Sequence, residues 1–230
     1  MNNKPKETQI GYEDDYHKSK HKHLYTNPRY YKARSELAKR RYFGGIKNIE
    51  TKKILEFGSG LGQNLFWLPK ERRIGYDISK FAIDFFKSKG GRGTTDITRI
   101  PENSFDIVFS AHVLEHVDNP LETLRVMHSK LRKGGALILV TPIDKGKKIK
   151  SNVLRPDINQ HLWTWTPQLM NNLLIKAGFK PIYNKVIPTC GYKKLLFSRR
   201  LGLRFYDFMT KFAGRVVRDK ELKFVAVKVW

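Results

Sequence analysis

The sequence predicts an α/β protein in which short buried strands alternate with helices. Three observations point to this class. An apolar run that ends in an acid is followed by three alternating glycines, within residues 54–64. Further short apolar runs bounded by glycine or proline recur along the chain. Between them lie longer segments whose apolar residues repeat with helical spacing. This alternation favours a parallel sheet covered by helices.

The stretch at residues 54–64 reads as strand, tight turn and helix. Residues 53–57 are short and apolar, as a buried parallel strand would be, and residues 61–68 are expected to form the helix that follows. Gly58, Gly60 and Gly62 remove every Cβ from one side of the turn, so the backbone can bend sharply and a ligand can approach it closely. We therefore expect a small molecule to bind here, with a plain structural turn as the alternative.

Three acids lie at the ends of successive predicted strands. Glu56 precedes the glycines, Asp77 ends the run 73–77, and Asp96 comes where a third strand would end. Asp77 can accept two hydrogen bonds from a ribose diol, and Asp96 suits an adenine amino group or is a plain surface acid. Because no positive residue lies in the turn, the acids suit a ligand with amines and a sulfonium better than a pyrophosphate.

The other elements follow in order. Pro28 opens a helix that runs to residue 43, and Ser79 caps a helix that ends at residues 90–91. The link from residue 96 to residue 104 is too short for a crossover helix. The remaining strands and helices are expected at residues 105–110 (strand), 120–131 (helix), 136–141 (strand), 168–177 (helix), 179 onward (strand) and 222–230 (strand).

Residues 192–220 form an insertion longer than the fold needs. A helix here would carry an apolar face and basic residues around it. The apolar positions are Phe205, Phe208, Met209, Phe212 and Val216. Such a helix can lie on an anionic membrane, cover a lipid-like substrate, form a dimer contact or pack on its own domain. The preceding basic residues favour a surface or anionic-substrate role.

The formal net charge of +24 indicates an anionic partner: nucleic acid, an acidic membrane surface or a charged substrate. A basic proteome or high intracellular salt is the alternative. His17, His21 and His23 lie among lysines without an acid or cysteine at ligand spacing, which favours a solvated basic face. The single Cys190 fits a reducing compartment. We expect a cytoplasmic protein, with peripheral membrane contact as a further option, and the oligomeric state stays open.

Two motifs now identify a resemblance. Residues 54–64 resemble motif I of class I S-adenosylmethionine-dependent methyltransferases, in particular the type 11/23 branch, and A-H-V-L-E-H-V-D-N-P at residues 111–120 resembles motif IV. The likeness extends from about Lys53 to about Lys180, with Lys133 in place of a proline in the pattern that precedes strand five. It implies a Rossmann-like, seven-stranded mixed sheet with helices on both faces and the last strand antiparallel between strands five and six.

The resemblance also implies S-adenosyl-L-methionine as the cofactor and assigns the residues that bind it. These are Glu56, Gly58, Gly60, Gly62, Asn64, Asp77, Ile78, Asp96, Ile97, Ser110 and His112. Family members usually carry a helix before strand one that covers the cofactor. Tyr25, Tyr30, Tyr31 and Arg34 are therefore candidates for a lid, or the tyrosines pack in the core.

Methyl transfer to a hydroxyl needs a base, and histidine suits this role. His116 and His161 are the candidates, while His112 is expected to line the cofactor pocket; a structural role is the alternative for each. Some family members bind a divalent metal through E-x-x-E-H or E-x-x-D-H. Because His112 replaces the first acid here, we predict no metal, with His112, Glu115, His116 and His161 as the conceivable ligand set.

We divide the chain into a basic segment with a lid helix at residues 1–45 and a methyltransferase domain at residues 46–230, which includes the insertion at 192–220. The favoured function is O-methylation of a small-molecule, sugar or lipid-linked acceptor. The alternative is an RNA methyltransferase that uses the basic surface. A cofactor-binding pseudoenzyme is disfavoured because the cofactor motifs are intact.

Overall fold

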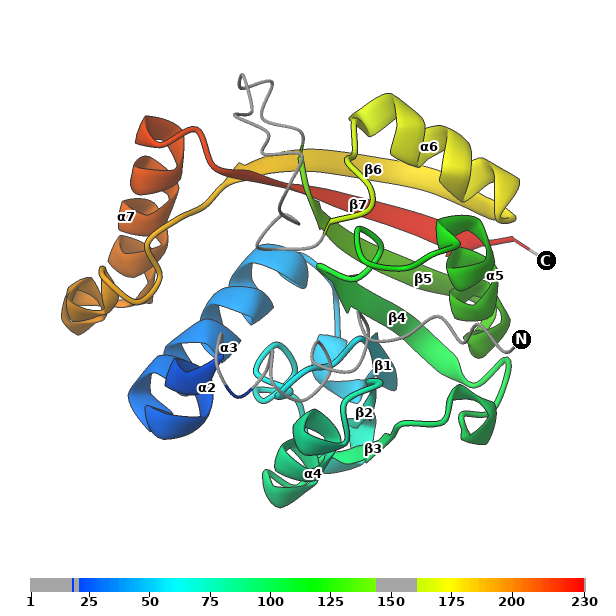
Figure 1. Cartoon of the computed structure of the whole chain (residues 1–230), viewed down its shortest axis with the longest axis horizontal. Coiled ribbons are helices and arrows are strands. Elements are labelled where there is room, and N and C mark those ends of the chain that lie inside the picture. Colours follow the sequence, from blue (N-terminus) through cyan, green and yellow to red (C-terminus); the bar gives the residue numbers. More distant parts are fainter. Residues whose placement is uncertain (1–17, 19–20, 144–160, 230) are drawn as a thin grey trace, which may run out of the picture.

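A computed structural model describes residue 18, residues 21–143 and residues 161–229 of the chain. The predictions for residues 1–17, which include His17, and for the basic loop at residues 144–150 lie outside this part. Within it, one seven-stranded sheet forms the centre of the molecule, in the order β3-β2-β1-β4-β5-β7-β6 (Figure 1). The strands are β1 (Ile54–Phe57), β2 (Arg73–Tyr76), β3 (Arg92–Thr94), β4 (Phe105–Ala111), β5 (Leu131–Pro142), β6 (Phe179–Pro188) and β7 (Lys220–Lys228).

The pairing of the strands confirms the predicted topology. Strands β1 to β5 pair in parallel, and β7 lies between β5 and β6 and runs antiparallel to both. The carboxyl ends of β1, β2 and β4 therefore lie at one edge of the sheet, where ligands of this fold class bind. The α-helices around the sheet are α2 (Lys22–Thr26), α3 (Pro28–Tyr42), α4 (Lys80–Ser88), α5 (Pro120–Lys130), α6 (Pro167–Lys176) and α7 (Leu203–Val216), and the short 3-10 helix η4 (Leu196–Leu201) precedes α7.

Alternation along the strands divides the core into two layers. Leu55 and Val108 face the side covered by α5 and α6. Ile54, Ile107 and Phe109 face the opposite side, which is covered by α3. Successive strand side chains point to opposite faces, so the near-continuous apolar runs of these strands fit a sheet that is buried on both sides.

Polar side chains cap the two helices predicted to begin at Pro28 and after Ser79. The side chain of Asn27 accepts a hydrogen bond from the backbone N–H of Tyr30 at the start of α3, where Pro28 occupies the first turn. Ser79 caps α4 in the same way. A cap of this kind satisfies one of the free N–H groups at a helix start. Both predicted helix starts are confirmed.

The helix predicted at residues 61–68 does not form; the segment is a series of turns. The backbone N–H of Trp67 donates to Ser35 Oγ of α3 at 3.0 Å. The indole N–H of Trp67 donates to the backbone carbonyl of Asn64 at 2.7 Å. Pro69 follows directly and disfavours a helical residue before it. The segment thus exchanges its own helical hydrogen bonds for contacts with α3.

Candidate functional site

The glycine turn after β1 has a backbone that only glycine adopts easily. Gly58, Gly60 and Gly62 all have positive φ, at 74°, 49° and 76°. A Cβ on Gly58 would lie 2.1 Å from Val113 Cγ2, and one on Gly62 would lie 2.0 Å from the ring of Phe86. The glycines are therefore required twice, for the turn itself and for its close packing against the segment after β4 and against α4.

Asp77 holds this turn in place. One carboxylate oxygen accepts the Gly60 N–H at 2.7 Å, and the other accepts the Ser79 N–H at 2.9 Å. The side chain is nearly buried, at 7% exposure. Asp77 thus lies at the end of β2, where this fold class holds the acceptor for a ligand diol. Ile78 next to it is 54% exposed, as expected of an apolar residue at the mouth of a site.

Glu56 lies beneath the turn rather than on its surface. It is fully buried and accepts a hydrogen bond from Asn64 Nδ2 at 2.7 Å, while its second oxygen has no hydrogen-bond partner within residues 21–143 and 161–229. Burial raises the pKa of this carboxyl to about 8, with Asp77 adding to the rise and the Asn64 hydrogen bond opposing it. Glu56 is therefore largely protonated near neutral pH and supports the loop through Asn64.

The third acid and its neighbour take structural positions. Asp96 accepts hydrogen bonds from Thr98 N at 3.0 Å and Thr98 Oγ1 at 2.6 Å, and these bonds lower its pKa. It caps the 3-10 helix η3 (Ile97–Arg99), and Ile97 packs on the core beside it. The Asp96 side chain is 46% exposed, so it remains reachable for a ligand at the end of β3.

Ser110 lies at the carboxyl end of β4, opposite Phe57 at the end of β1. Its side chain is completely buried, and Oγ has no hydrogen-bond partner among the described residues. A buried hydroxyl without a partner is uncommon in a native structure. The turn, the acid Asp77 and this hydroxyl thus converge at the ends of β1, β2 and β4.

Helix α3 covers the turn. The Tyr31 hydroxyl donates to the Leu61 carbonyl at 2.9 Å, and the ring packs edge-on against Phe66. Tyr25 of α2 packs against Phe81 and Phe85 of α4. Tyr31 is thus buried, and Tyr25 packs at the boundary of α2 with α4, so both contribute to packing.

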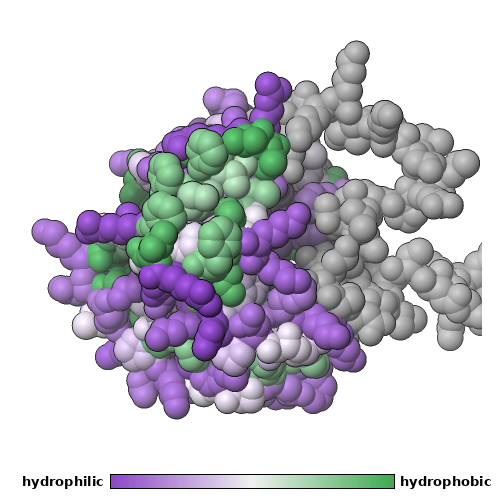
Figure 2. Space-filling model, turned by 90° about the vertical axis from the view of Figure 1, so that its left-hand side faces the viewer, coloured by the Kyte–Doolittle hydropathy of each residue, from purple (hydrophilic) through white to green (hydrophobic). Residues whose placement is uncertain are grey.

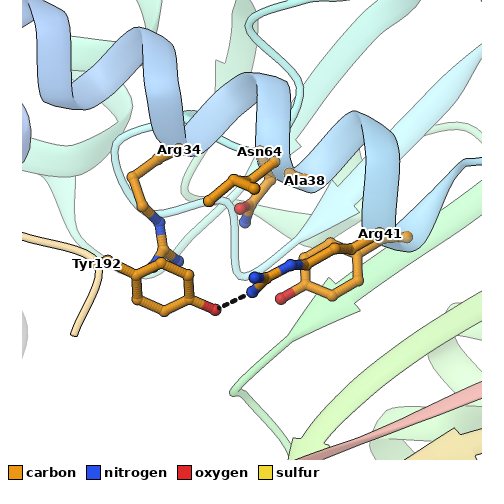
Figure 3. A pocket seen from close by; sticks show the side chains of 7 residues that line it. Arg34, Ala38, Arg41, Asn64 and Tyr192 are labelled. Atoms are coloured by element: carbon orange, nitrogen blue, oxygen red, sulfur yellow. Dashed lines mark hydrogen bonds between the residues drawn. The ribbon is translucent and has the colours of Figure 1, made fainter. Parts of the chain in front are cut away.

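Arg34 lies further along α3, in a gap beside Asn64 and Tyr192 (Figure 3). Its guanidinium stacks on the Tyr192 ring, 3.6 Å from the centroid. The gap has essentially no room even for a water molecule, so it is not a ligand pocket.

His112 opens the segment after β4 in a strained conformation, with φ of 58°. Its Nδ1 lies 3.3 Å from Glu115 Oε1, and its Nε2 lies 3.3 Å from Glu221 Oε1. Burial alone would lower the pKa of the imidazole, but the two carboxylates raise it to about 10. The side chain is 45% exposed, so solvent screens part of this effect. His112 is nevertheless a cation at neutral pH, which makes it unsuited to accept a proton.

A buried polar network connects His112 with α7, and sequence reasoning missed most of it. Glu221 of β7 accepts hydrogen bonds from Tyr42 at 2.8 Å and from Tyr192 at 3.4 Å. Arg41 of α3 donates to Tyr192 at 2.9 Å and to Asp207 of α7 at 2.6 Å. The sequence offered two signals for this network. Glu221 is an acid beside an apolar final strand, and Arg41 is an arginine on the apolar face of a predicted helix.

His116 and His161 lie side by side, and both lie close to Glu115. The rings of the two histidines meet edge to face with centroids 4.9 Å apart, and His116 Nε2 lies 4.0 Å from Glu115 Oε1. The backbone of Glu115 accepts the Leu162 N–H at 2.8 Å, which fixes the segment that carries His161. The structure thus places both predicted base candidates in one cluster after β4.

Glu115 is fully buried, and neither of its carboxylate oxygens has a hydrogen bond of good geometry to another residue that the structure describes. Ligand atoms of Glu115, His116 and His161 all lie within 4.8 Å of one another, so these three could hold a metal ion. His112, the first residue of the conceivable ligand set, is not part of this group: it is held between Glu115 and Glu221 as a cation. Glu115 therefore already has a positive neighbour.

The residues present fit an adenosine-containing cofactor with a sulfonium. Asp77 offers carboxylate oxygens as acceptors for a diol, and the buried Ser110 hydroxyl has no hydrogen-bond partner in the described part of the chain. No lysine or arginine lies in the turn itself to bind a pyrophosphate.

Comparison with protein families gives a match over residues 25–184 to a family described as a methyltransferase domain. The tRNA U34 carboxymethyltransferase of Saccharophagus degradans is 31% identical over 152 residues, which are 57% of this chain and 46% of that protein. The ubiquinone biosynthesis O-methyltransferase of Ruegeria pomeroyi is 32% identical over 90 residues, 35% of this chain and 36% of that protein. The chain spans about half the length of the curated relatives it matches, or less.

Among solved structures, an SAM-dependent methyltransferase from Thermotoga maritima is similar in fold. The TM-score is 0.62 at 16% identity, and the match covers 93% of this chain and 97% of that one. At this identity the likeness concerns the fold alone.

Proposed function

We propose that this chain, which belongs to the methyltransferase domain family, is an S-adenosylmethionine-dependent enzyme that methylates a hydroxyl oxygen of a small-molecule, sugar or lipid-linked acceptor. When bound, the cofactor supplies an electrophilic methyl group and a neutral thioether as leaving group. Such a displacement depends mainly on holding donor and acceptor in line and excluding water.

The glycine turn would hold the cofactor through its backbone. Asp77 would accept hydrogen bonds from the ribose diol. Ser110 and Ile78 would line the site around it. Glu56 would act from below by keeping Asn64 and the turn in place, since its carboxyl does not reach the surface. His112, as a cation, is suited to an anionic group of cofactor or acceptor.

The observation that carries the proposal is the pairing of His116 with His161 at the end of β4. A hydroxyl must lose its proton as its oxygen bonds the methyl carbon, and a positioned imidazole can take that proton. The raised pKa of His112 removes the third histidine of this region from the role. We therefore assign the base to the pair His116 and His161, with Glu115 as the group that orients it.

A second candidate function, RNA methylation, rests on two observations. The relative from Saccharophagus degradans is named for a tRNA modification, and the net charge of +24 suits a polyanion. The first candidate is favoured over methylation of an exocyclic base amine, because S-A-H-V at residues 110–113 is not the Asn/Asp-Pro-Pro-aromatic signature that reads such an amine.

Methyl-labelled S-adenosylmethionine tests the proposal. The protein is incubated with the labelled cofactor and a lysate, which is then separated into RNA, protein and organic-soluble or glycan fractions. We expect label in the organic-soluble or glycan fraction, and none with the Asp77→Ala variant. Label confined to nuclease-sensitive material would refute the proposal and establish the RNA function.

A further inference from the structure

The outward face of η4 and α7 is an exposed apolar surface. It comprises side chains that are each 38% exposed or more. They are Phe197, Leu201, Phe205, Phe208, Phe212 and Val216, which we call the α7 face. Along α7 the rings of Phe205, Phe208 and Phe212 follow one another at centroid distances of 6.4 and 6.3 Å. Figure 2 views the molecule from this side and shows apolar surface gathered between hydrophilic side chains. Contiguous exposed apolar surface of this kind marks an interaction site.

The opposite, buried face of α7 keeps the aromatic side of the helix outward. Tyr206, Asp207, Thr210 and Gly214 are buried, although three of them are polar. Asp207 forms a buried ion pair with Arg41, and the Tyr206 hydroxyl donates to the Tyr192 carbonyl at 2.6 Å. A Cβ on Gly214 would meet the backbone of Thr189 at 2.2 Å. The helix is therefore held by its polar face, and the aromatic face cannot turn inward without breaking these contacts.

The charge around the α7 face is strongly positive. Residues 192–220 contain nine basic residues and two acids, and one of these acids, Asp207, is buried in its ion pair. A helix with an aromatic face and a basic rim is the pattern of interfacial membrane binding. A second copy of the chain is a poor occupant, because two such basic rims would face each other.

A basic groove adjoins the α7 face, between α3 and η4. It measures about 530 Å³ and is lined by Arg29, Lys32, Ala33, Glu36, Leu196, Phe197, Arg199 and Arg200. Arg199 is paired with Glu36 at 2.8 Å, which leaves Arg29, Lys32 and Arg200 as cations around a partly apolar floor. Its size is that of a small-molecule site, and its cations suit a phosphate group.

We propose that the α7 face docks the protein on an anionic membrane, with the groove between α3 and η4 holding a lipid phosphate headgroup. The aliphatic side chains of Leu201 and Val216 favour lipid over RNA, since they offer a base neither stacking nor hydrogen bonds. The described part of the chain has no helix long and apolar enough to cross a membrane, so the contact is peripheral. The inference deepens the proposed function, because α3 lies between this surface and the cofactor site.

Vesicle sedimentation of the full chain, without cofactor, tests the proposal independently of methyl transfer. We expect the protein to sediment with vesicles of phosphatidylglycerol and phosphatidylcholine, and not with phosphatidylcholine alone. Phe208→Ser/Phe212→Ser should weaken this binding by about tenfold or more. Leu169→Ser/Ile175→Ser, which removes side chains 55% and 56% exposed on α6, is the matched control and should bind as the wild type does.

A third variant, Lys32→Glu/Arg200→Glu, tests the groove and should reduce binding while leaving the fold intact by circular dichroism. Absence of sedimentation with the anionic vesicles, or an equal loss in the α6 control, would overturn the proposal. Binding of bulk tRNA that depends on Phe208 and Phe212, without vesicle binding, would assign the face to nucleic acid. If vesicles bind but no label enters lipid, the docking surface stands and the proposed acceptor class fails.

Discussion

At the scale of single residues, the acids around the glycine turn have different states. Glu56 lies in the interior with a raised pKa, whereas Asp77 is fixed by two backbone N–H groups. The sequence predicted that both acids serve the cofactor site, but it could not separate their roles, because burial depends on the segment 61–68 and on α3. A carboxylate that already accepts the loop N–H groups is prepared to accept a ligand hydroxyl without reorganisation.

Asp77→Ala should reduce the affinity for S-adenosylmethionine by about 10- to 100-fold or more, since a hydrogen bond to a charged group contributes about 1.5–3 kcal/mol. Isothermal titration calorimetry measures this directly. Asp84→Ala, which removes an exposed acid of α4 paired with Lys80, is the control and should keep the wild-type affinity. An unchanged dissociation constant for Asp77→Ala would reject the cofactor assignment.

Glu56→Gln should stabilise the protein more as the pH rises. The folded-state pKa of about 8 lies above the ordinary value of 4.5, so the unfolded chain loses this proton first. The wild type then loses stability between about pH 4.5 and pH 8, by at most about 1.4 kcal/mol per pH unit. Gln has no such proton and can still accept from Asn64. Urea unfolding at pH 5 and pH 7.5 gives the difference between the two proteins, and a difference that does not change with pH would contradict the buried, protonated state.

Removal of divalent metal should leave methyl transfer unchanged. The proposed reaction needs a proton acceptor rather than a metal, the histidines are proposed for that role, and Glu115 lies beside the cationic His112. Label transfer is compared before and after dialysis against EDTA. A rate that disappears and returns with added Mg²⁺, Mn²⁺ or Zn²⁺ would instead assign Glu115, His116 and His161 as metal ligands.

At the scale of elements, local signals decided what could be predicted. Pro28 and the cap Ser79 predicted correct helix starts, because these signals act within a few residues. The helix predicted at residues 61–68 was wrong because hydrogen-bond donors of this segment bind partners that include Ser35, about thirty residues away. The periodicity of α7 identified its two faces, but not that the aromatic face would lie outward, which depends on Arg41 of α3.

Gly58→Ala should destabilise the fold more than Gly134→Ala. Both glycines have nearly the same positive φ, 74° and 72°, so the backbone penalty of about 1–2 kcal/mol is shared. A Cβ at Gly134 meets nothing within 4 Å, whereas at Gly58 it meets Val113 at 2.1 Å, which adds about 1–3 kcal/mol. Chemical denaturation of both variants measures the difference. Equal losses would mean that the turn is not packed against the segment after β4.

At the scale of the whole molecule, the sheet order and the antiparallel β7 agree with the prediction, because the family resemblance fixes them. The network from His112 through Glu221 and Tyr192 to Arg41 and Asp207 could not be predicted, since residues that bond within it, such as Arg41 and Asp207, are as much as 166 positions apart in sequence. This network joins the helix that carries the α7 face to the end of β4. The surface proposed to meet the membrane and the segment after β4 that carries His116 therefore lie on elements that this network connects.

The pair His116 and His161 is proposed to remove a proton from a hydroxyl acceptor. The direct test is the initial rate of label transfer from S-adenosylmethionine into the organic-soluble or glycan acceptor, for the wild type, His116→Ala and His161→Ala. At least one variant should lose about 10²- to 10⁴-fold in rate at unchanged cofactor affinity, and added imidazole should restore part of it. Wild-type rates in both variants would show that neither histidine is the base.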